Sequence, residues 1–283
     1  MAHQPAGSAS TLSESESQRI FSEAIAPVIT SRVGADRPVT PRVIMLGGQP
    51  GSGKTSRLRF PAEDELKGAG GFITIDADQL RTYHPQWEAL SQEDDSTAAV
   101  LTQPDAAKWV SQAINLATRE GCHVVFDGTM GSPESVMNRI QLFSDAGYQI
   151  DIRILAVDQH RSWLGVLRRY EEAKARIGTG RMTPRDVHNE AYDGLLKTLE
   201  RIESIRPAVR IRLYSRDGTV VFDSESQSVH ATAVEALQKE RDRAWSPSEM
   251  QEFRDDVEQL TQVATKRGAD QTTIEGYRAL TGP

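Results

Sequence analysis

A short apolar segment, Val43 to Leu46, runs directly into the glycine-rich sequence Gly47-Gly48-Gln49-Pro50-Gly51-Ser52-Gly53-Lys54-Thr55-Ser56. The segment predicts a buried parallel strand, and the sequence after it matches the P-loop pattern. Its glycines let the backbone turn successive N–H groups toward phosphate oxygens, and the helix that follows adds its positive end. We expect Gly48, Gln49, Pro50, Gly51, Ser52, Gly53, Lys54, Thr55 and Ser56 to bind ATP or GTP, with Lys54 on the outer phosphates and the Thr55 hydroxyl on Mg²⁺.

Further apolar segments alternate with helical ones along the chain. Strands are expected at residues 72–75, 123–126, 150–157 and 209–214, and a turn at Asp217-Gly218 leads into a last strand at 220–222. This alternation predicts an α/β fold, a P-loop kinase-like parallel β-sheet sandwiched by helices.

The two ends of the chain differ from this pattern. Residues 1–18 are polar and predict a disordered tail, and residues 19–40 predict a helix and a linker, with Pro27 kinking or ending the helix. The kinase domain is expected over 41–225, where Pro61 shortens or bends the helix after the P-loop. Residues 226–283 predict a helical extension that opens with a capping box at Ser246 and Glu249. We expect this extension to pack on the domain's own surface; a partner-binding helix is the alternative.

Composition excludes several classes of protein. The formal net charge of −7 does not suit a general nucleic-acid binder. Cys122 is the single cysteine, so no intramolecular disulfide forms, and its place in an expected strand indicates a small buried side chain. No apolar stretch reaches membrane-spanning length, and the N-terminus lacks a secretory signal. We expect a cytoplasmic protein without membrane or nucleic-acid partners.

Carboxylates stand where ligands of parallel sheets bind, beyond the carboxyl ends of the strands. Asp76 and Asp78 would share one side of the chain if the strand conformation continued to Asp78. Phosphoryl transfer to an alcohol requires a proton acceptor, and we assign that role to Asp78, with Asp76 in a supporting or magnesium-linked role. Asp127 is expected to hold a magnesium-bound water or a substrate hydroxyl, and Thr129 to donate from its hydroxyl. The alternative for the aspartates is an ordinary turn carboxylate.

A basic segment follows the fourth expected strand. Between Arg161 and Arg185 the chain carries seven basic residues against two acidic ones, although the whole chain is acidic. Negative charge spreads over the transferring oxygens in the transition state. We expect these cations to form a lid over the phosphates, with Gly178 and Gly180 allowing it to move; a solvated helical face is the alternative.

Taken together, these motifs resemble the zeta toxin family over roughly residues 40 to 225. The resemblance is carried by the P-loop sequence, Ile75-Asp76-Ala77-Asp78 with His84-Pro85, Gly128-Thr129, Leu164-Gly165 with Arg169-Tyr170-Glu171, Arg181-x-Thr183-Pro184, and Ile211-Arg212-Leu213-Tyr214. It implies a P-loop kinase that phosphorylates a hydroxyl of UDP-N-acetylglucosamine, and many members are held inactive by a small helical antitoxin.

The resemblance also implies residue roles. Lys54 and Thr55 match the nucleotide-binding pair, Asp78 the catalytic base, Arg169 and Arg181 the phosphate-clamping arginines, and Thr129 a substrate-side threonine. Three positions on the substrate side depart from the family pattern: Asp127 replaces a glutamate, Ala77 an asparagine, and Gly131 a frequent basic residue.

Other functions remain open at this stage. A P-loop switch or motor would hydrolyse nucleotide without an acceptor, but the chain has no Asn-Lys-x-Asp guanine-reading sequence. An inert binding protein on a dead kinase scaffold is disfavoured by intact Lys54, Thr55 and Asp78. Within the kinase class, an antibiotic phosphotransferase or a nucleic-acid 5′-kinase is the alternative.

Overall fold

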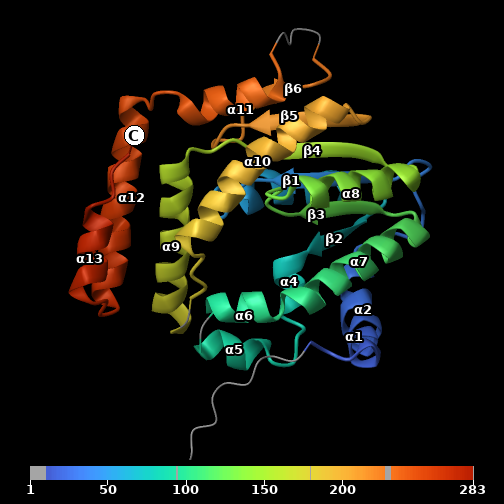
Figure 1. Cartoon of the computed structure of the whole chain (residues 1–283), viewed down its shortest axis with the longest axis horizontal. Helices are drawn as coiled ribbons and strands as arrows, with labels where there is room; N and C mark the ends of the chain where they lie inside the picture. Colours follow the sequence, from blue (N-terminus) through green and yellow to red (C-terminus); the bar gives the residue numbers. More distant parts are fainter. Residues whose placement is uncertain (1–10, 94, 179, 227–230, 283) are drawn as a thin grey trace, which may run out of the picture.

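A six-stranded sheet forms the centre of the computed structural model, which describes residues 11–93, 95–178, 180–226 and 231–282 (Figure 1). The strands lie in the order β2-β3-β1-β4-β5-β6. Neighbours are parallel except for β5 and β6, which are antiparallel. The strand bounds are β1 Arg42–Gly47, β2 Phe72–Asp76, β3 His123–Asp127, β4 Gln149–Leu155, β5 Val209–Tyr214 and β6 Val220–Asp223. The expected α/β fold is confirmed, including the hairpin at Asp217-Gly218.

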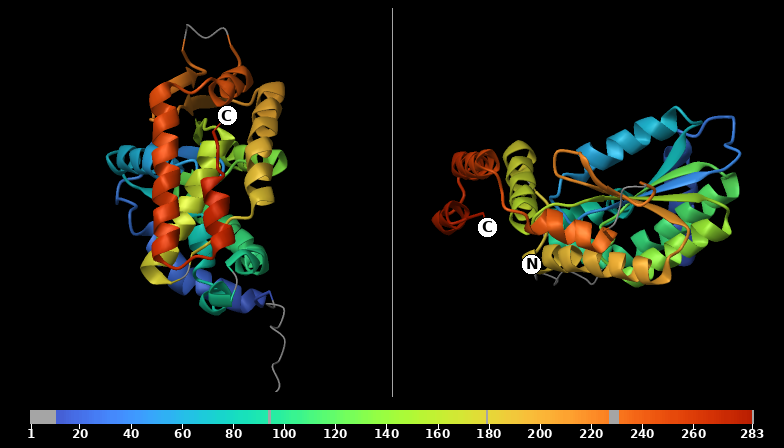
Figure 2. Two further views of the ribbon diagram at one scale, coloured as in Figure 1. Left: turned by 90° about the vertical axis from the view of Figure 1, so that its left-hand side faces the viewer. Right: turned by 90° about the horizontal axis from the view of Figure 1, so that it is seen from above.

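Helices cover both faces of the sheet (Figure 2). Their bounds are α1 Glu14–Ile20, α2 Ala26–Thr30, α3 Phe60–Lys67, α4 Ala77–Arg81, α5 Trp87–Glu93, α6 Asp95–Leu101, α7 Gln103–Glu120, α8 Pro133–Asp145, α9 Gln159–Ile177, α10 Arg185–Ile205, α11 Ala233–Asp242, α12 Pro247–Lys266 and α13 Gln271–Arg278. Two π-helical turns, Phe21–Ile25 and Thr55–Arg59, precede α2 and α3.

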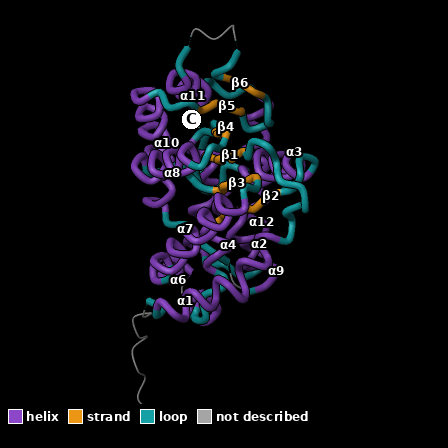
Figure 3. Tube along the Cα trace, turned by 90° about the vertical axis from the view of Figure 1, so that its right-hand side faces the viewer, coloured by secondary structure: helices purple, strands orange, loops and turns teal. Residues whose placement is uncertain are grey.

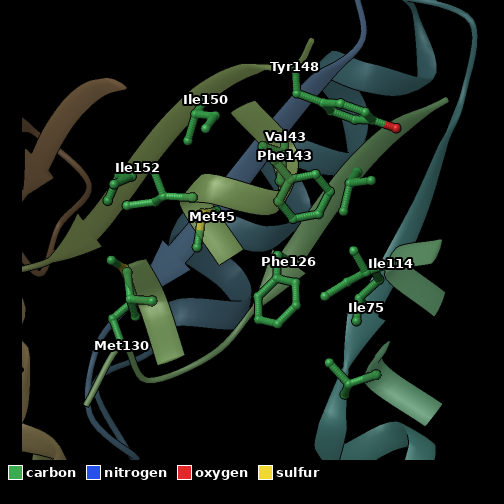
Figure 4. Close-up of a cluster of buried hydrophobic side chains, with 14 of the residues drawn as sticks. Val43, Met45, Ile75, Ile114, Phe126, Met130, Phe143, Tyr148, Ile150 and Ile152 are labelled. Atoms are coloured by element: carbon green, nitrogen blue, oxygen red, sulfur yellow. The ribbon is translucent and has the colours of Figure 1, made fainter. Parts of the chain in front are cut away.

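Strand β1 shows why the sheet is buried on both sides. Val43 and Met45 point into the larger core, which holds residues of α7, α8 and α10 (Figure 4), whereas Ile44 and Leu46 point into a smaller core under α3. Alternate residues of a strand face opposite sides, so an uninterrupted apolar strand requires cover on both. The edge of the sheet at the end of β1 is therefore the place where polar groups can gather.

The two prolines expected to interrupt helices are accommodated in the same way. Pro27 and Pro61 each occupy the second position of an α-helix that follows a π-helical turn. Ala26 and Phe60, directly before them, donate to carbonyls five residues back. A proline has no N–H and its ring clashes with the preceding turn, and the wider π turn provides the room. Neither helix ends at its proline.

The first helix begins earlier in the chain than expected. Residues 1–10 lie outside the described part of the chain, but α1 starts at Glu14 with Ser13 as its cap, so the expected disordered tail over 1–18 is wrong for its last residues. The Trp109 indole donates to the carbonyl of Ser17 at 3.2 Å, and Ile20 is buried in the main core. Tertiary contacts with α7 order a segment whose composition is polar.

The C-terminal extension packs on the protein itself, as expected. Ala233 and Leu237 of α11 are buried in the main core. Helix α12 lies beside α9 (Figures 2 and 3), and α13 packs against α12. The expected capping box at Ser246 is confirmed and starts α12. No helix in the described ranges is both long and apolar enough to cross a membrane.

A buried carboxylate fastens this extension to α9. Glu171 is fully buried and accepts hydrogen bonds from the Arg267 guanidinium and, at 2.6 Å, from the Tyr277 hydroxyl. Burial alone raises the pKa of Glu171, but Arg267 and Tyr277 outweigh it and the pKa lies below its usual value. The ionised form therefore stabilises the docked extension.

We expect Glu171→Gln to lower the free energy of unfolding by roughly 2–4 kcal/mol at neutral pH, because Arg267 loses its partner. Since the folded pKa of Glu171 is lowered, this difference is complete above the unfolded carboxyl pKa of about 4.3 and shrinks as the pH falls through the folded value. Chemical denaturation from pH 7 to pH 3 measures it. Glu172→Gln, at an exposed neighbour, is the control, and equal losses in both variants would contradict the role of Glu171.

Candidate active site

A cavity of about 960 Å³ lies at the carboxyl ends of β1, β2 and β3. The P-loop, α8 and α9 form its walls together with residues that follow the strands. It brings together most of the side chains predicted from the sequence, and the predicted site residues that line it are Gln49, Pro50, Gly51, Ser52, Gly53, Lys54, Thr55, Ser56, Asp76, Asp78, Asp127, Thr129, Arg169 and Arg181. Gly48 lies at the start of the same loop.

The P-loop has the backbone that its glycines predict. Gly48, Gly51 and Gly53 all have positive φ angles, of 151°, 76° and 93°. A Cβ on Gly51 would lie 2.0 Å from the carbonyl oxygen of Ser162, and a Cβ on Gly165 would lie 2.2 Å from the carbonyl oxygen of Gly51. The loop therefore rests directly on α9, and only glycine fits on either side of this contact.

Gln49 contributes to the loop in a way that the motif does not predict. Its side chain is buried, and its amide group donates to the carbonyl of Val157 at 2.8 Å and to the Ser162 hydroxyl at 3.0 Å. Its carbonyl oxygen accepts from Arg241 of α11 at 3.3 Å. The Gln49 side chain thus anchors the loop, and only its backbone remains available to a phosphate.

The Lys54 ammonium lies 3.1 Å from a carboxylate oxygen of Asp127. Arg59, which sequence reasoning missed, bridges Asp76 at 3.0 Å and Asp127 at 3.6 Å. Asp76 and Asp127 are neighbours because β2 and β3 pair in register at these residues. Burial raises the pKa of Asp76, and the Asp127 and Asp78 carboxylates raise it further against the opposing Arg59. No sequence motif marks Arg59; its role follows from the turn of helix after the P-loop.

The prediction that Asp76 and Asp78 share one side of an extended strand is wrong. Strand β2 ends at Asp76, whose carboxylate caps α4 by accepting from the Asp78 N–H at 2.9 Å. Both oxygens of Asp76 are therefore engaged, one by this cap and one by Arg59. Asp78 still reaches the cavity, because it lies in the first turn of α4 with its side chain exposed.

Asp78 is surrounded by arginines. Arg181 lies 2.7 Å from one carboxylate oxygen and Arg81 contacts the other. Desolvation raises the pKa of Asp78, but Arg181, Arg81 and Arg169 lower it more, so that it falls below its usual value. The carboxylate is charged at neutral pH. Both of its oxygens contact arginines, so an incoming hydroxyl would have to displace one of them.

Thr129 joins the P-loop to the strand beside it. Its carbonyl accepts from the Gly48 N–H at 3.3 Å, and its hydroxyl accepts from the Gly131 N–H at 3.3 Å. The next residue, Met130, has a positive φ of 56°, and its carbonyl is held by the buried Thr198 hydroxyl at 2.7 Å. A fixed, strained loop therefore presents Thr129 to the cavity.

The cations predicted to form a lid differ in where they lie, and the lid itself stays a prediction. Arg168, Arg169 and Arg181 line the cavity. The guanidinium carbon of Arg161 instead lies 4.5 Å from the centre of the Trp245 ring. That of Arg185 lies 4.9 Å from the centre of the Trp163 ring. Arg168 forms an ion pair with Asp256 of α12 at 2.5 Å, so the C-terminal extension reaches the rim of the site.

The residues present suit a magnesium–nucleotide complex. The described part of the chain contains no cluster of three metal-binding side chains, and Mg²⁺ in kinase sites binds one or two protein oxygens together with substrate phosphates and water. The exposed Thr55 hydroxyl, with Asp127 nearby, fits that pattern. The buried Ser52 hydroxyl lacks a hydrogen-bond partner in the described residues, as expected of a loop shaped around an anion.

A P-loop at the end of a central parallel strand, a facing carboxylate and surrounding arginines define a kinase-like P-loop protein. The family model described as Zeta toxin matches residues 29–227, and the chain therefore belongs to the Zeta toxin family.

Individual relatives agree with this assignment. The chain is 28% identical to Toxin PezT of Streptococcus pneumoniae over 228 residues, covering 80% of this chain and 85% of that protein. It is 30% identical to Toxin zeta of Enterococcus hirae over 222 residues, covering 78% and 76%. A solved structure from the PezAT chromosomal toxin–antitoxin system of Streptococcus pneumoniae matches with a TM-score of 0.73 at 25% identity, covering 92% of this chain and 97% of that one.

We expect Arg241→Met to weaken ATP·Mg²⁺ binding at least roughly tenfold, about 1.4 kcal/mol. Arg241 is buried and holds Gln49, yet in the described ranges no carboxylate lies within ion-pair distance of it and its Nε is unpaired. The variant loses both the anchor and a positive charge behind the phosphates. It also loses the hydrogen bond from Arg241 to the Tyr192 carbonyl at 3.0 Å and the contact of the guanidinium with the Tyr192 ring at 3.7 Å, so we expect some loss of folding free energy as well.

Calorimetric titration of ATP·Mg²⁺ together with denaturant unfolding of the free protein separates these effects. Arg241→Lys, which keeps the charge, should lie between the wild type and Arg241→Met. A large loss of stability with unchanged nucleotide affinity would show that Arg241 serves the fold alone.

Proposed function

We propose that this protein transfers the γ-phosphoryl group of ATP or GTP to a hydroxyl of a UDP-sugar, most directly UDP-N-acetylglucosamine, and acts as a zeta-type toxin in the cytoplasm. One observation carries the proposal: Asp78 faces the same cavity as the P-loop and is held there by Arg181, while Asp76 is occupied by its cap and by Arg59. An exposed charged carboxylate beside a phosphate site suits an alcohol acceptor better than simple hydrolysis.

Each residue has a distinct role in this reaction. The P-loop amides and Lys54 hold the outer phosphates. The Thr55 hydroxyl would hold Mg²⁺, which would supply positive charge to the phosphates. The acceptor oxygen attacks the γ-phosphorus, its proton passes to Asp78, and the bond to the leaving nucleoside diphosphate breaks. Arg169 and Arg181 stabilise the charge on the transferring oxygens. Asp76 and Arg59 keep the α4 end of the cavity in place.

A small helical antitoxin is the proposed protein partner, because the solved relative belongs to a toxin–antitoxin system by its description. Incubation with ATP or GTP and a panel of UDP-sugars, scored by mass for added phosphate, tests the activity. Lys54→Ala serves as the inactive control. The runner-up is a phosphotransferase for an antibiotic or a nucleic-acid end, and nucleotide hydrolysis without any acceptor would favour a regulatory switch.

For Asp78→Asn we expect the chemical step to slow by roughly 10²- to 10⁴-fold, because the amide keeps the shape but accepts no proton. ATP·Mg²⁺ affinity should change little, since the P-loop supplies most phosphate contacts. Single-turnover kinetics with saturating acceptor and a titration of ATP·Mg²⁺ measure the two effects. A near-normal single-turnover rate would show that Asp78 is not the base. A fall in both this rate and the ATP·Mg²⁺ affinity would indicate that Asp78 helps to bind the metal.

Asp127→Glu is expected to change the relative rates with UDP-N-acetylglucosamine and other UDP-sugars, because the added methylene moves the carboxylate toward the acceptor. Competition between pairs of UDP-sugars, followed by mass, measures these ratios directly. If the relative rates with the UDP-sugars stay unchanged but the magnesium requirement shifts, Asp127 acts with Lys54 on the metal and does not contact the sugar.

A further inference from the structure

Arg139 of α8 is a cation in the cavity wall without an anionic partner. Its guanidinium lies 4.7 Å from the centre of the Phe126 ring, and it forms no hydrogen bond or ion pair with any residue that the structure describes. Its side chain is half-buried, and burial lowers the pKa of its guanidinium. A partly desolvated charge without a counter-ion costs free energy, so the ligand-free protein leaves this group poised for an anion.

The other arginines that line the cavity already have polar partners. Arg81 and Arg181 contact Asp78. Arg168 lies 2.5 Å from Asp256 and Arg216 lies 4.0 Å from it. Arg169 donates to the Thr183 hydroxyl at 3.1 Å. Among these described cations, Arg139 alone is held only by an aromatic ring.

The sheet order places Arg139 on the acceptor side of the P-loop. Strands β3 and β2 lie on one side of β1, and β4 and β5 on the other. Arg168 and Arg169 follow β4, whereas Arg139 follows β3 and stacks on Phe126, the neighbour of Asp127 in that strand. Arg139 therefore lies on the side of the carboxylates proposed to handle the acceptor.

The geometry of the guanidinium favours phosphate. Stacking uses one face of the group and leaves the N–H edge free, and this planar fork matches two phosphate oxygens. Ser135, one helical turn earlier on α8, also lines the cavity and adds a hydroxyl donor. Gly131, on the same side of the cavity, carries no side chain, and a Cβ there would lie 3.3 Å from the Cα of Ala191.

We propose that Arg139 binds a phosphate group of the acceptor and makes this site specific for anionic acceptors such as nucleoside-diphosphate sugars. This inference rests on the proposed function for the identity of the acceptor, but the anion site itself is independent of it. A guanidinium at this place repels a polycationic antibiotic, which separates the proposal from one of the alternatives.

The test uses UDP as the probe, titrated calorimetrically onto the full chain whose P-loop is saturated with a non-hydrolysable ATP analogue and Mg²⁺. We expect Arg139→Gln to weaken UDP binding by about tenfold or more, the usual effect of losing a charged hydrogen-bond donor, with unchanged affinity for the ATP analogue. Arg139→Lys should retain part of the binding. Arg278→Gln, at an exposed arginine of α13, is the matched control and should behave as wild type.

Two results would overturn the proposal: a wild-type protein that binds no UDP under these conditions, or equal UDP affinities in wild type and Arg139→Gln. Equal thermal unfolding of the variants confirms that the fold is intact. Phosphoryl transfer to UDP-sugars is measured in parallel. If UDP binding depends on Arg139 but no phosphoryl group is transferred to UDP-sugars, the proposed function is refuted and the anion site is still supported.

Discussion

The contact between the P-loop and helix α9 fixes the geometry of the whole site. Gly51 and Gly165 approach so closely that neither position accepts a side chain, and the Gln49 amide group hydrogen-bonds to Ser162 from the loop side. Arg168 and Arg169 lie on the same helix, one turn beyond this contact. Because the loop and the arginines share one rigid support, their spacing does not depend on flexible segments, as stabilisation of a charged transition state requires.

Charge balance in the ligand-free cavity follows from this arrangement. Lys54 is paired with Asp127, and Arg181 with Asp78. These contacts keep partly desolvated charges neutralised until phosphates arrive. In the proposed reaction, nucleotide and acceptor would replace the carboxylates as partners of the cations, and this would free Asp78 to face a hydroxyl. Among the described residues, Arg139 has no carboxylate partner of this kind. This distinguishes the proposed acceptor side of the cavity from the nucleotide side.

The C-terminal extension contacts the kinase-like core at the candidate site, although it lies outside the part matched by the family model. Arg241 of α11 supports Gln49, and Asp256 of α12 pairs with Arg168 at the cavity rim. Glu171 fastens α12 and α13 to α9 from behind. A rearrangement of this extension would therefore change the contacts of the P-loop and of Arg168.

The sequence by itself determined the alternation of strands and helices, the P-loop and the carboxylates at the ends of β2 and β3, because these depend on local patterns of glycine, apolar residues and strand ends. It also predicted the cap of α12. The start of α4 at Ala77 depends on a local cap by Asp76 that the sequence reading did not recognise. Tertiary structure alone decided that α1 is ordered and that Arg59, Arg139 and Arg241 reach the site. These features depend on contacts between residues far apart in the chain, and a single sequence does not encode such distances in any local pattern.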